Sequence, residues 1–253
     1  MNIVLIGSGN IATVWGKAFA QLGHNITQVY SHKLANACAL ANLLSAEGID
    51  ELTKLNLEAE LYILAVSDSA IPEIVDQLPK QIKGILIHCS GASDIAVLNK
   101  FEQYGVAYPI QSFSKDVELD FKTIPFGIEA NTKQNVDFLT KLFSSLSENV
   151  FPCDSEQRLA IHLGAVIVNN FSNALFQMAY ELLAQHQLPF NLLQPIILET
   201  AQKVQNRIPR DVQTGPAVRN DDVTINKHLQ FISDNPEWQS IYQQITDLIK
   251  KRG

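Results

Sequence analysis

The chain has 253 residues, which is enough for one large domain or two modest ones. Hydrophobic residues make up 46% and charged residues 18%, as in a globular protein with a full core. The net charge of −7 argues against a nucleic-acid-binding protein, which usually presents a basic face. The three cysteines lack metal-site or C-x-x-C spacing, which favours a reducing compartment and no metal. We find no basic leader and no apolar stretch near about 20 residues, so we expect a cytoplasmic protein without a membrane segment.

The first sixteen residues carry the strongest motif of the chain. Residues 2–6 are an apolar run rich in β-branched side chains, typical of a buried strand. Gly7-Ser8-Gly9-Asn10-Ile11-Ala12 follows at once and opens a helical segment. Gly7 permits a sharp turn, Gly9 lets a pyrophosphate approach the backbone, and Ala12 lets the helix pack closely on the strand. With phosphates held at the helix N-terminus, this order predicts a dinucleotide-binding unit. The alternative is a glycine turn in a non-binding α/β domain.

The end of the second predicted strand, residues 25–30, bears on the choice of cofactor. An NAD-binding unit usually places an acidic residue there to accept a hydrogen bond from the ribose 2′-OH. This chain has Ser31, His32 and Lys33, of which none is acidic and two can donate to a phosphate. The pattern predicts NADP rather than NAD, although Ser31 can also serve as a helix N-cap. It also disfavours a methyltransferase, because those enzymes usually carry an acid at this place.

Strand and helix patterns alternate through the first half of the chain. We predict strands at 61–66, 84–88, 105–108, 124–129 and 150–151, and helices at 33–45, from about 70, at 94–104 and at 132–146. The alternation predicts a doubly wound parallel sheet with helices on both faces, whose ligands bind outside the carboxyl ends of the strands. We therefore assign the cofactor to Gly7, Ser8, Gly9, Asn10, Ile11, Ser31, His32, Lys33, Ala65, Val66, Ser67, Ser90 and Gly91.

The composition changes after Pro152, and no strand pattern follows. Asp154 and Gln157 form an N-cap pair for a helix that continues to about residue 185, roughly 45 Å long at 1.5 Å per residue. We predict a Rossmann-like domain at 1–152 and an all-helical domain for substrate binding and dimerisation at 153–253. A domain of about 100 residues is too small to bury so long an apolar helix alone, which predicts a homodimer through the helical domain.

One side of this long helix is polar. At 100° per residue the residues that share it are Arg158, His162, Ala165, Asn169, Ser172 and Asn173. Such a stripe faces water, a partner or a ligand, and we favour the wall of a cleft over a line of satisfied core hydrogen bonds. His162 is the candidate proton donor because the pKa of histidine lies near neutrality. Asn169 is placed to orient the substrate and Asn173 to bind it.

A second polar cluster spans residues 214–224. Its Arg219 can hold a carboxylate by two parallel hydrogen bonds, and we assign Asp221 to the substrate as well. Turn and capping chemistry is an equally weighted explanation of the cluster. Gln111, after a predicted strand, completes the substrate site together with Ser90. His228 is a reserve acid for which a structural role is favoured.

The N-terminal half resembles the NADP-binding domain of the pyrroline-carboxylate reductases and the deazaflavin-dependent NADP reductases. The likeness rests on the glycine motif, on Ala65-Val66-Ser67-Asp68 and on His88-Cys89-Ser90-Gly91-Ala92. The whole chain is similar to a two-domain group in which a Rossmann-like domain precedes a helical domain like the C-terminal part of 6-phosphogluconate dehydrogenase. The motifs of that group are Tyr108-Pro109-Ile110-Gln111-Ser112-Phe113, the helix with His162 and Asn169, Gly215-Pro216-Ala217-Val218-Arg219-Asn220-Asp221, and His228-Leu229.

This resemblance implies an oxidoreductase. Related hydroxyacid dehydrogenases use a lysine on the interdomain helix, and residues 154–187 contain none, which argues against that reaction. We predict an NADP-dependent enzyme that transfers a hydride to or from a small, polar, anionic substrate in the interdomain cleft. The alternative is a non-catalytic NADP-binding sensor.

Overall fold

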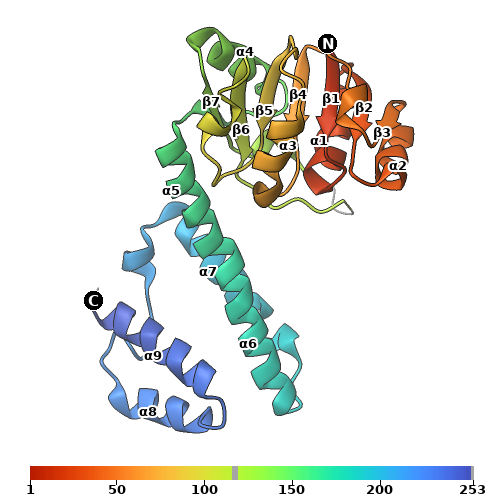
Figure 1. Ribbon diagram of the computed structural model, residues 1–253. Coiled ribbons are helices and arrows are strands. Elements are labelled where there is room, and N and C mark those ends of the chain that lie inside the picture. The colour runs from red at the N-terminus through yellow and green to blue at the C-terminus, as the bar shows by residue number, and fades with distance from the viewer. Residues whose placement is uncertain (116–118, 252–253) are drawn as a thin grey trace. The chain divides into compact units, whose positions relative to one another are not determined.

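The computed structural model describes residues 1–115 and 119–251, and an eight-stranded sheet organises its N-terminal part (Figure 1). The strands are β1 Asn2–Ile6, β2 Asn25–Tyr30, β3 Glu47–Ile49, β4 Leu61–Leu64, β5 Ile85–His88, β6 Tyr104–Pro109, β7 Phe126–Ala130 and β8 Val150–Pro152. Their order across the sheet is β3-β2-β1-β4-β5-β6-β7-β8. The predicted Rossmann-like, doubly wound class is confirmed. Because β1 and β4 are neighbours, their carboxyl ends lie side by side and can share a ligand.

The sheet is mostly rather than wholly parallel. Strand β7 runs antiparallel to β6, with Tyr108 paired to Gly127. A parallel connection needs a crossover, usually an α-helix. In the described part of the β6–β7 connection the only helical segment is the 3₁₀ turn Phe121–Thr123. The prediction of a fully parallel sheet is therefore corrected at its last two strands.

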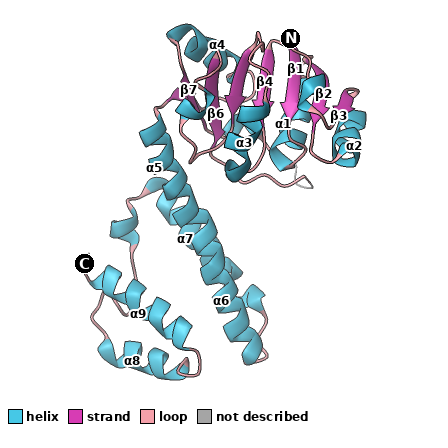
Figure 2. Cartoon of the chain, in the orientation of Figure 1, coloured by secondary structure: helices cyan, strands magenta, loops and turns pink. Residues whose placement is uncertain are grey.

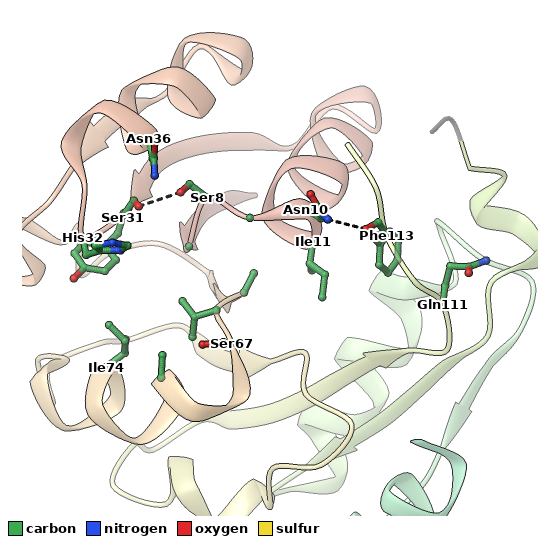
Figure 3. A pocket seen from close by; sticks show the side chains of 16 residues that line it. Ser8, Asn10, Ile11, Ser31, His32, Asn36, Ser67, Ile74, Gln111 and Phe113 are labelled. Carbon is green, nitrogen blue, oxygen red and sulfur yellow. Dashed lines mark hydrogen bonds between the residues drawn. The ribbon is translucent and has the colours of Figure 1, made fainter. Parts of the chain in front are cut away.

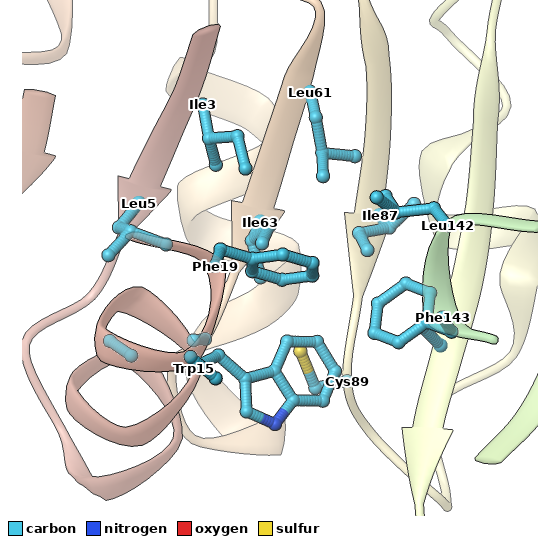
Figure 4. Packing of buried hydrophobic residues seen from close by; sticks show 14 of the residues in the cluster. Ile3, Leu5, Trp15, Phe19, Leu61, Ile63, Ile87, Cys89, Leu142 and Phe143 are labelled. Atoms are coloured by element: carbon cyan, nitrogen blue, oxygen red, sulfur yellow. The ribbon is translucent and has the colours of Figure 1, made fainter. Parts of the chain in front are cut away.

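Four helices cover the sheet: α1 Asn10–Gln21, α2 Leu34–Leu44, α3 Ile71–Gln77 and α4 Lys133–Phe143. On one face α1, α2 and α4 enclose a hydrophobic cluster in which the rings of Trp15 and Phe143 lie 5.2 Å apart (Figure 4). On the other face α3 encloses a second cluster. Successive β1 residues alternate between the two clusters, with Leu5 in the first and Ile6 in the second. Both faces are thus buried, as a Rossmann-like sheet requires.

The helix predicted over 94–104 is wrong. The structure has only a 3₁₀ turn, Ile95–Leu98, which Asp94 caps by accepting a hydrogen bond from the backbone of Ala96. Tyr104 already pairs with Leu86 in the sheet, so too few residues remain for the longer helix.

The chain divides into two compact units, Met1–Val168 and Asn169–Gly253. This division falls later than the predicted boundary at residue 152, because the helix α5, Ser155–Ala165, packs against the sheet and is joined to it by hydrogen bonds and an ion pair. The guanidinium of Arg158 on α5 is fully buried and forms an ion pair with Glu129 of β7. It also donates to the backbone carbonyl of Ser93.

The described residues of the second unit form helices joined by loops and include no strand (Figure 2). Its α-helices are α6 Ser172–Gln185, α7 Gln194–Asn206, α8 Asp222–Phe231 and α9 Pro236–Lys250.

The long helix predicted after residue 152 begins and ends as expected. The predicted capping box of Asp154 with Gln157 is confirmed, as is the end of the long helix at Gln185. Residues Val166–Phe171 form a π-helical segment. Its i→i+5 bonding changes the rotation per residue, so the predicted stripe does not continue unbroken from His162 to Asn173.

The helical stretch Ser155–Gln185 has the length and the apolar composition of a membrane-crossing helix, and no part of its most apolar window is buried within the chain. Our expectation that no stretch meets this criterion was wrong. One such helix is weak evidence for a membrane, because a core helix of a soluble protein has the same length and composition.

Candidate functional site

A cavity of about 580 Å³ opens at the carboxyl ends of β1, β2 and β4 (Figure 3). The glycine turn after β1 shapes it. Gly7 has φ +127°, and a Cβ there would lie 2.2 Å from the carbonyl oxygen of Ala65, so only glycine fits. Gly9 has an ordinary φ of −78°, and a Cβ there would meet no atom within 4 Å. Gly7 is therefore needed by the fold, whereas Gly9 leaves open space beside the cavity.

Most of the predicted cofactor residues line this cavity. They are Gly7, Ser8, Gly9, Asn10, Ile11, Ser31, His32, Ala65, Val66 and Ser67, and the predicted substrate residue Gln111 joins them. Lys33 does not line it, because it is the exposed residue before α2. Ser90 and Gly91 do not line it either, because they follow β5, the next strand of the sheet.

The donors and charges of the cavity fit a dinucleotide. No side chain caps the start of α1, so the N–H groups there face the glycine turn without a side-chain acceptor, as a pyrophosphate requires. The Ser8 hydroxyl donates to that of Ser31 at 3.0 Å, where the turn meets the end of β2. None of the described residues lining the cavity is acidic, which suits the added phosphate of NADP. When bound, such a cofactor would donate a hydride in its reduced form and accept one in its oxidised form.

A tyrosine–histidine pair lies at the ends of the next two strands. The Tyr108 hydroxyl, at the end of β6, lies 3.1 Å from Nδ1 of His162 on α5. Gly91 makes room for the imidazole, because a Cβ there would lie 2.7 Å from its ring. Burial raises the pKa of Tyr108, and the charge of Asp68 adds to the effect. Tyr108 and His162 thus bring a hydroxyl and an imidazole to the carboxyl end of the sheet, the end at which the cavity opens.

The sequence analysis placed Tyr108 at the end of the predicted strand 105–108 and in a family motif but did not assign it a role. Its position at a strand end was the available signal, whereas its partner is 54 residues away along the chain. Arg158 was expected on the same polar stripe as His162. The structure instead buries Arg158 in an ion pair with Glu129. For this residue the alternative explanation of the stripe, hydrogen bonding within the core, therefore holds.

His88, at the end of β5, is a structural residue. It is fully buried, and its Nδ1 accepts a hydrogen bond from the backbone N–H of Ser90 at 3.1 Å. Burial, and then the charge of Arg158, lower the pKa of His88 to about 3. The ring is therefore neutral at physiological pH and cannot serve as a general acid.

The remaining predicted residues belong to the second unit. Asn169, Asn173 and Arg219 are exposed there, and their roles stay predictions. Asp221 caps α8, and its carboxylate accepts from the backbone and hydroxyl of Thr224 at 3.1 and 2.7 Å. Those hydrogen bonds lower the pKa of Asp221. Helix capping, the alternative given for the polar cluster 214–224, thus explains the presence of Asp221.

The fold and the glycine turn define a two-domain protein with a Rossmann-like dinucleotide-binding domain. The family model of a Rossmann-like domain matches residues 1–111, and that of a domain of unknown function, DUF2520, matches residues 124–249. A crystal structure from Bacteroides fragilis, of the protein BF3122, is 40% identical over 99% of this chain and 98% of that one, with a TM-score of 0.89. It is named as a presumed NADP oxidoreductase. The chain belongs to the family of this protein.

More distant structures share the fold. A 1-pyrroline-5-carboxylate reductase from Streptococcus pyogenes is 14% identical, with a TM-score of 0.67 over 99% of this chain and 98% of that one. An imine reductase from Myxococcus stipitatus, solved in complex with NADP⁺, is 15% identical, with a TM-score of 0.65 over 99% of this chain and 92% of that one. No curated protein matches the chain.

Proposed function

We propose that the protein is an NADP-dependent oxidoreductase that transfers a hydride to or from a small, polar, anionic substrate. The observation that carries this proposal is the cavity at the glycine turn, where an uncapped helix N-terminus meets the non-acidic pair Ser31 and His32. The name of the Bacteroides fragilis relative, at 40% identity, supports both the cofactor and the reaction class. The imine reductase with bound NADP⁺ supports the use of this fold for that cofactor.

Reduction of a C=O or C=N bond needs a proton donor, and we assign this role to His162. Histidine is the side chain most often used to move a proton in catalysis, and the Tyr108 hydroxyl 3.1 Å from Nδ1 of His162 orients its ring. Tyr108 lies at the end of β6, and His162 packs against Gly91, which follows β5. Both strands continue the sheet beyond β4. We keep Gln111, Asn169 and Asn173 as substrate-binding residues and Arg219 as the group that holds a substrate carboxylate. The predicted cleft between the two domains stays a prediction.

We propose that a second copy of the chain buries the exposed apolar side chains of the helical stretch Ser155–Gln185. Leu163, Val168 and Phe171 are 56%, 73% and 56% exposed in the single chain. A bilayer is a poorer cover, because the exposed amides of Asn169 and Asn173 on the same helical stretch would find no water there to hydrogen-bond. We therefore propose a cytoplasmic homodimer. Light scattering at micromolar concentration should give about twice the 28.1 kDa chain mass, and a monomer would refute the dimer.

Calorimetry with NADP⁺ and NAD⁺ tests the cofactor, and NADPH oxidation with a panel of imines and keto acids tests the reaction. We expect micromolar or tighter NADP⁺ binding and turnover with at least one panel member. Tight NADPH binding without turnover of any compound would favour the sensor. Failure to bind either dinucleotide would overturn the proposal.

A further inference from the structure

The segment that follows β6 lies against the glycine turn of β1, although more than 100 residues separate them along the chain. The Asn10 side-chain amide donates to the carbonyl oxygen of Phe113 at 2.8 Å (Figure 3). The ammonium group of Lys115 donates to the carbonyl oxygen of Ser8 at 3.1 Å. Lys115 is therefore held at the turn on which the cofactor is proposed to bind.

Lys115 lines a second, smaller cavity of about 210 Å³ between α1 and α2. Ser8 and Asn36, which Figure 3 labels in the larger cavity, line the smaller one as well, so the two cavities adjoin at these residues. Among the described residues that line either cavity, Lys115 is the single lysine or arginine. The ammonium group of Lys115 thus lies beside Ser8, where the two cavities adjoin.

This end is where the adenosine ribose binds in a Rossmann-like fold, since the turn after β1 and the end of β2 meet there. The hydrogen-bonded hydroxyls of Ser8 and Ser31 mark the place. NADP differs from NAD by a phosphate on the ribose 2′ oxygen. Lys33, which sequence reasoning assigned to that phosphate, lines neither cavity.

We propose that Lys115 binds the 2′-phosphate of NADP and so determines the preference for NADP over NAD. The inference rests on the proposed function and adds a residue from outside the nucleotide-binding motif. The exposed ammonium group of Lys115 donates to the neutral carbonyl of Ser8. Its flexible four-carbon stem lets it move to a phosphate, where the hydrogen bond becomes charge-assisted and stronger.

A purely structural role makes a different prediction. If Lys115 only holds the segment 111–115 on the turn, its loss weakens NADP⁺ and NAD⁺ binding by the same factor. If it contacts the 2′-phosphate, its loss weakens NADP⁺ binding alone. Hydrogen bonds to charged groups are worth enough to change affinity about 10- to 100-fold.

The test is calorimetric titration of wild type, Lys115→Ala and Lys115→Arg with NADP⁺, NAD⁺ and the fragment adenosine 2′,5′-bisphosphate. We expect Lys115→Ala to weaken NADP⁺ and the fragment about 10- to 100-fold and to leave NAD⁺ within about twofold. Lys115→Arg should restore most of the NADP⁺ affinity. The matched control is Lys133→Ala, which removes the same charge from an exposed residue. Lys133 is the first residue of α4, which follows β7. Because β7 runs antiparallel to β6, it ends at the amino end of the parallel strands, away from the cavity.

The outcomes separate the two proposals. Wild type that fails to bind NADP⁺ overturns the proposed function, and the inference with it. Wild type that binds NADP⁺, with Lys115→Ala either unchanged or equally weakened for both dinucleotides, overturns the role of Lys115 alone. Circular dichroism and the melting temperature should be unchanged in each variant, because the side chain is exposed.

Discussion

Replacing Gly9 with aspartate is expected to abolish dinucleotide binding and to leave the fold intact. The backbone of Gly9 has φ −78°, and a Cβ there would meet no atom within 4 Å, so the side chain enters without strain. Gly9 is also the N-cap of α1, where aspartate is a favoured residue. The new carboxylate would accept from the first N–H groups of the helix, which are the groups that a pyrophosphate needs. The variant therefore blocks the site while it caps the helix.

The loss of affinity can be worked out from the charges. Two like charges about 4 Å apart repel by about 4 kcal/mol at an effective dielectric constant of 20. That repulsion corresponds to roughly a thousandfold in the dissociation constant. Calorimetry with NADP⁺ measures the loss, and thermal unfolding should show a melting temperature equal to or slightly above that of wild type. Gly9→Asn, which caps the helix without charge, should lose much less affinity. Wild-type binding by Gly9→Asp would refute the placement of the phosphates.

Gly7→Ala is the contrasting variant. Gly7 has φ +127°, and its Cβ would lie 2.2 Å from the carbonyl oxygen of Ala65. We therefore expect Gly7→Ala to lower the melting temperature, whereas Gly9→Asp does not. If both variants melt like wild type, the strain inferred at the turn is wrong.

Three further predictions concern His162, Arg158 and His88. His162→Asn should lower kcat with the NADP⁺ affinity unchanged, and a wild-type kcat would place the acid elsewhere. Arg158→Met should cost about 3–5 kcal/mol of unfolding free energy in urea titrations, because it leaves the Glu129 carboxylate unpaired, and adding Glu129→Gln should recover part of the loss. The pKa of His88 is about 6.5 in the unfolded chain and about 3 in the folded chain, so between these pH values only the unfolded chain binds the proton. The free energy of unfolding should therefore fall by about 1.4 kcal/mol for each pH unit as the pH decreases from 6.5 to 3. His88→Asn keeps an acceptor for Ser90 and should flatten that slope; an unchanged slope would assign the effect to other groups.

The cofactor half of the site could be predicted because its information is local. A strand, a glycine turn and a helix adjoin along the chain, and parallel strands bring their carboxyl ends to one edge. The pairing of Tyr108 with His162 and the burial of Arg158 against Glu129 could not be predicted in this way. Each joins groups far apart along the chain, and helical periodicity says only that two residues share a side, not what that side meets.

The backbone differences have equally specific causes. The reversal of β7 goes with a connection whose described residues contain a 3₁₀ turn and no α-helix, which its loop-like composition allowed but did not require. The π-helical segment Val166–Phe171 changes the rotation that a period of 100° assumes. The ammonium group of Lys115 reaches the turn at Ser8 from a loop, where no periodicity or motif marks it.

The two edges of the sheet also bear on solubility. Both are three-residue strands, β3 Glu47–Ile49 and β8 Val150–Pro152, and the second ends in a proline that cannot donate a ladder hydrogen bond. Short edges offer few unpaired N–H and C=O groups to a neighbouring chain, so sheet-to-sheet aggregation is disfavoured. The proposed association of two copies through their apolar helices would therefore meet little competition from strand pairing, and such a two-copy contact can close on itself rather than extend into a fibre.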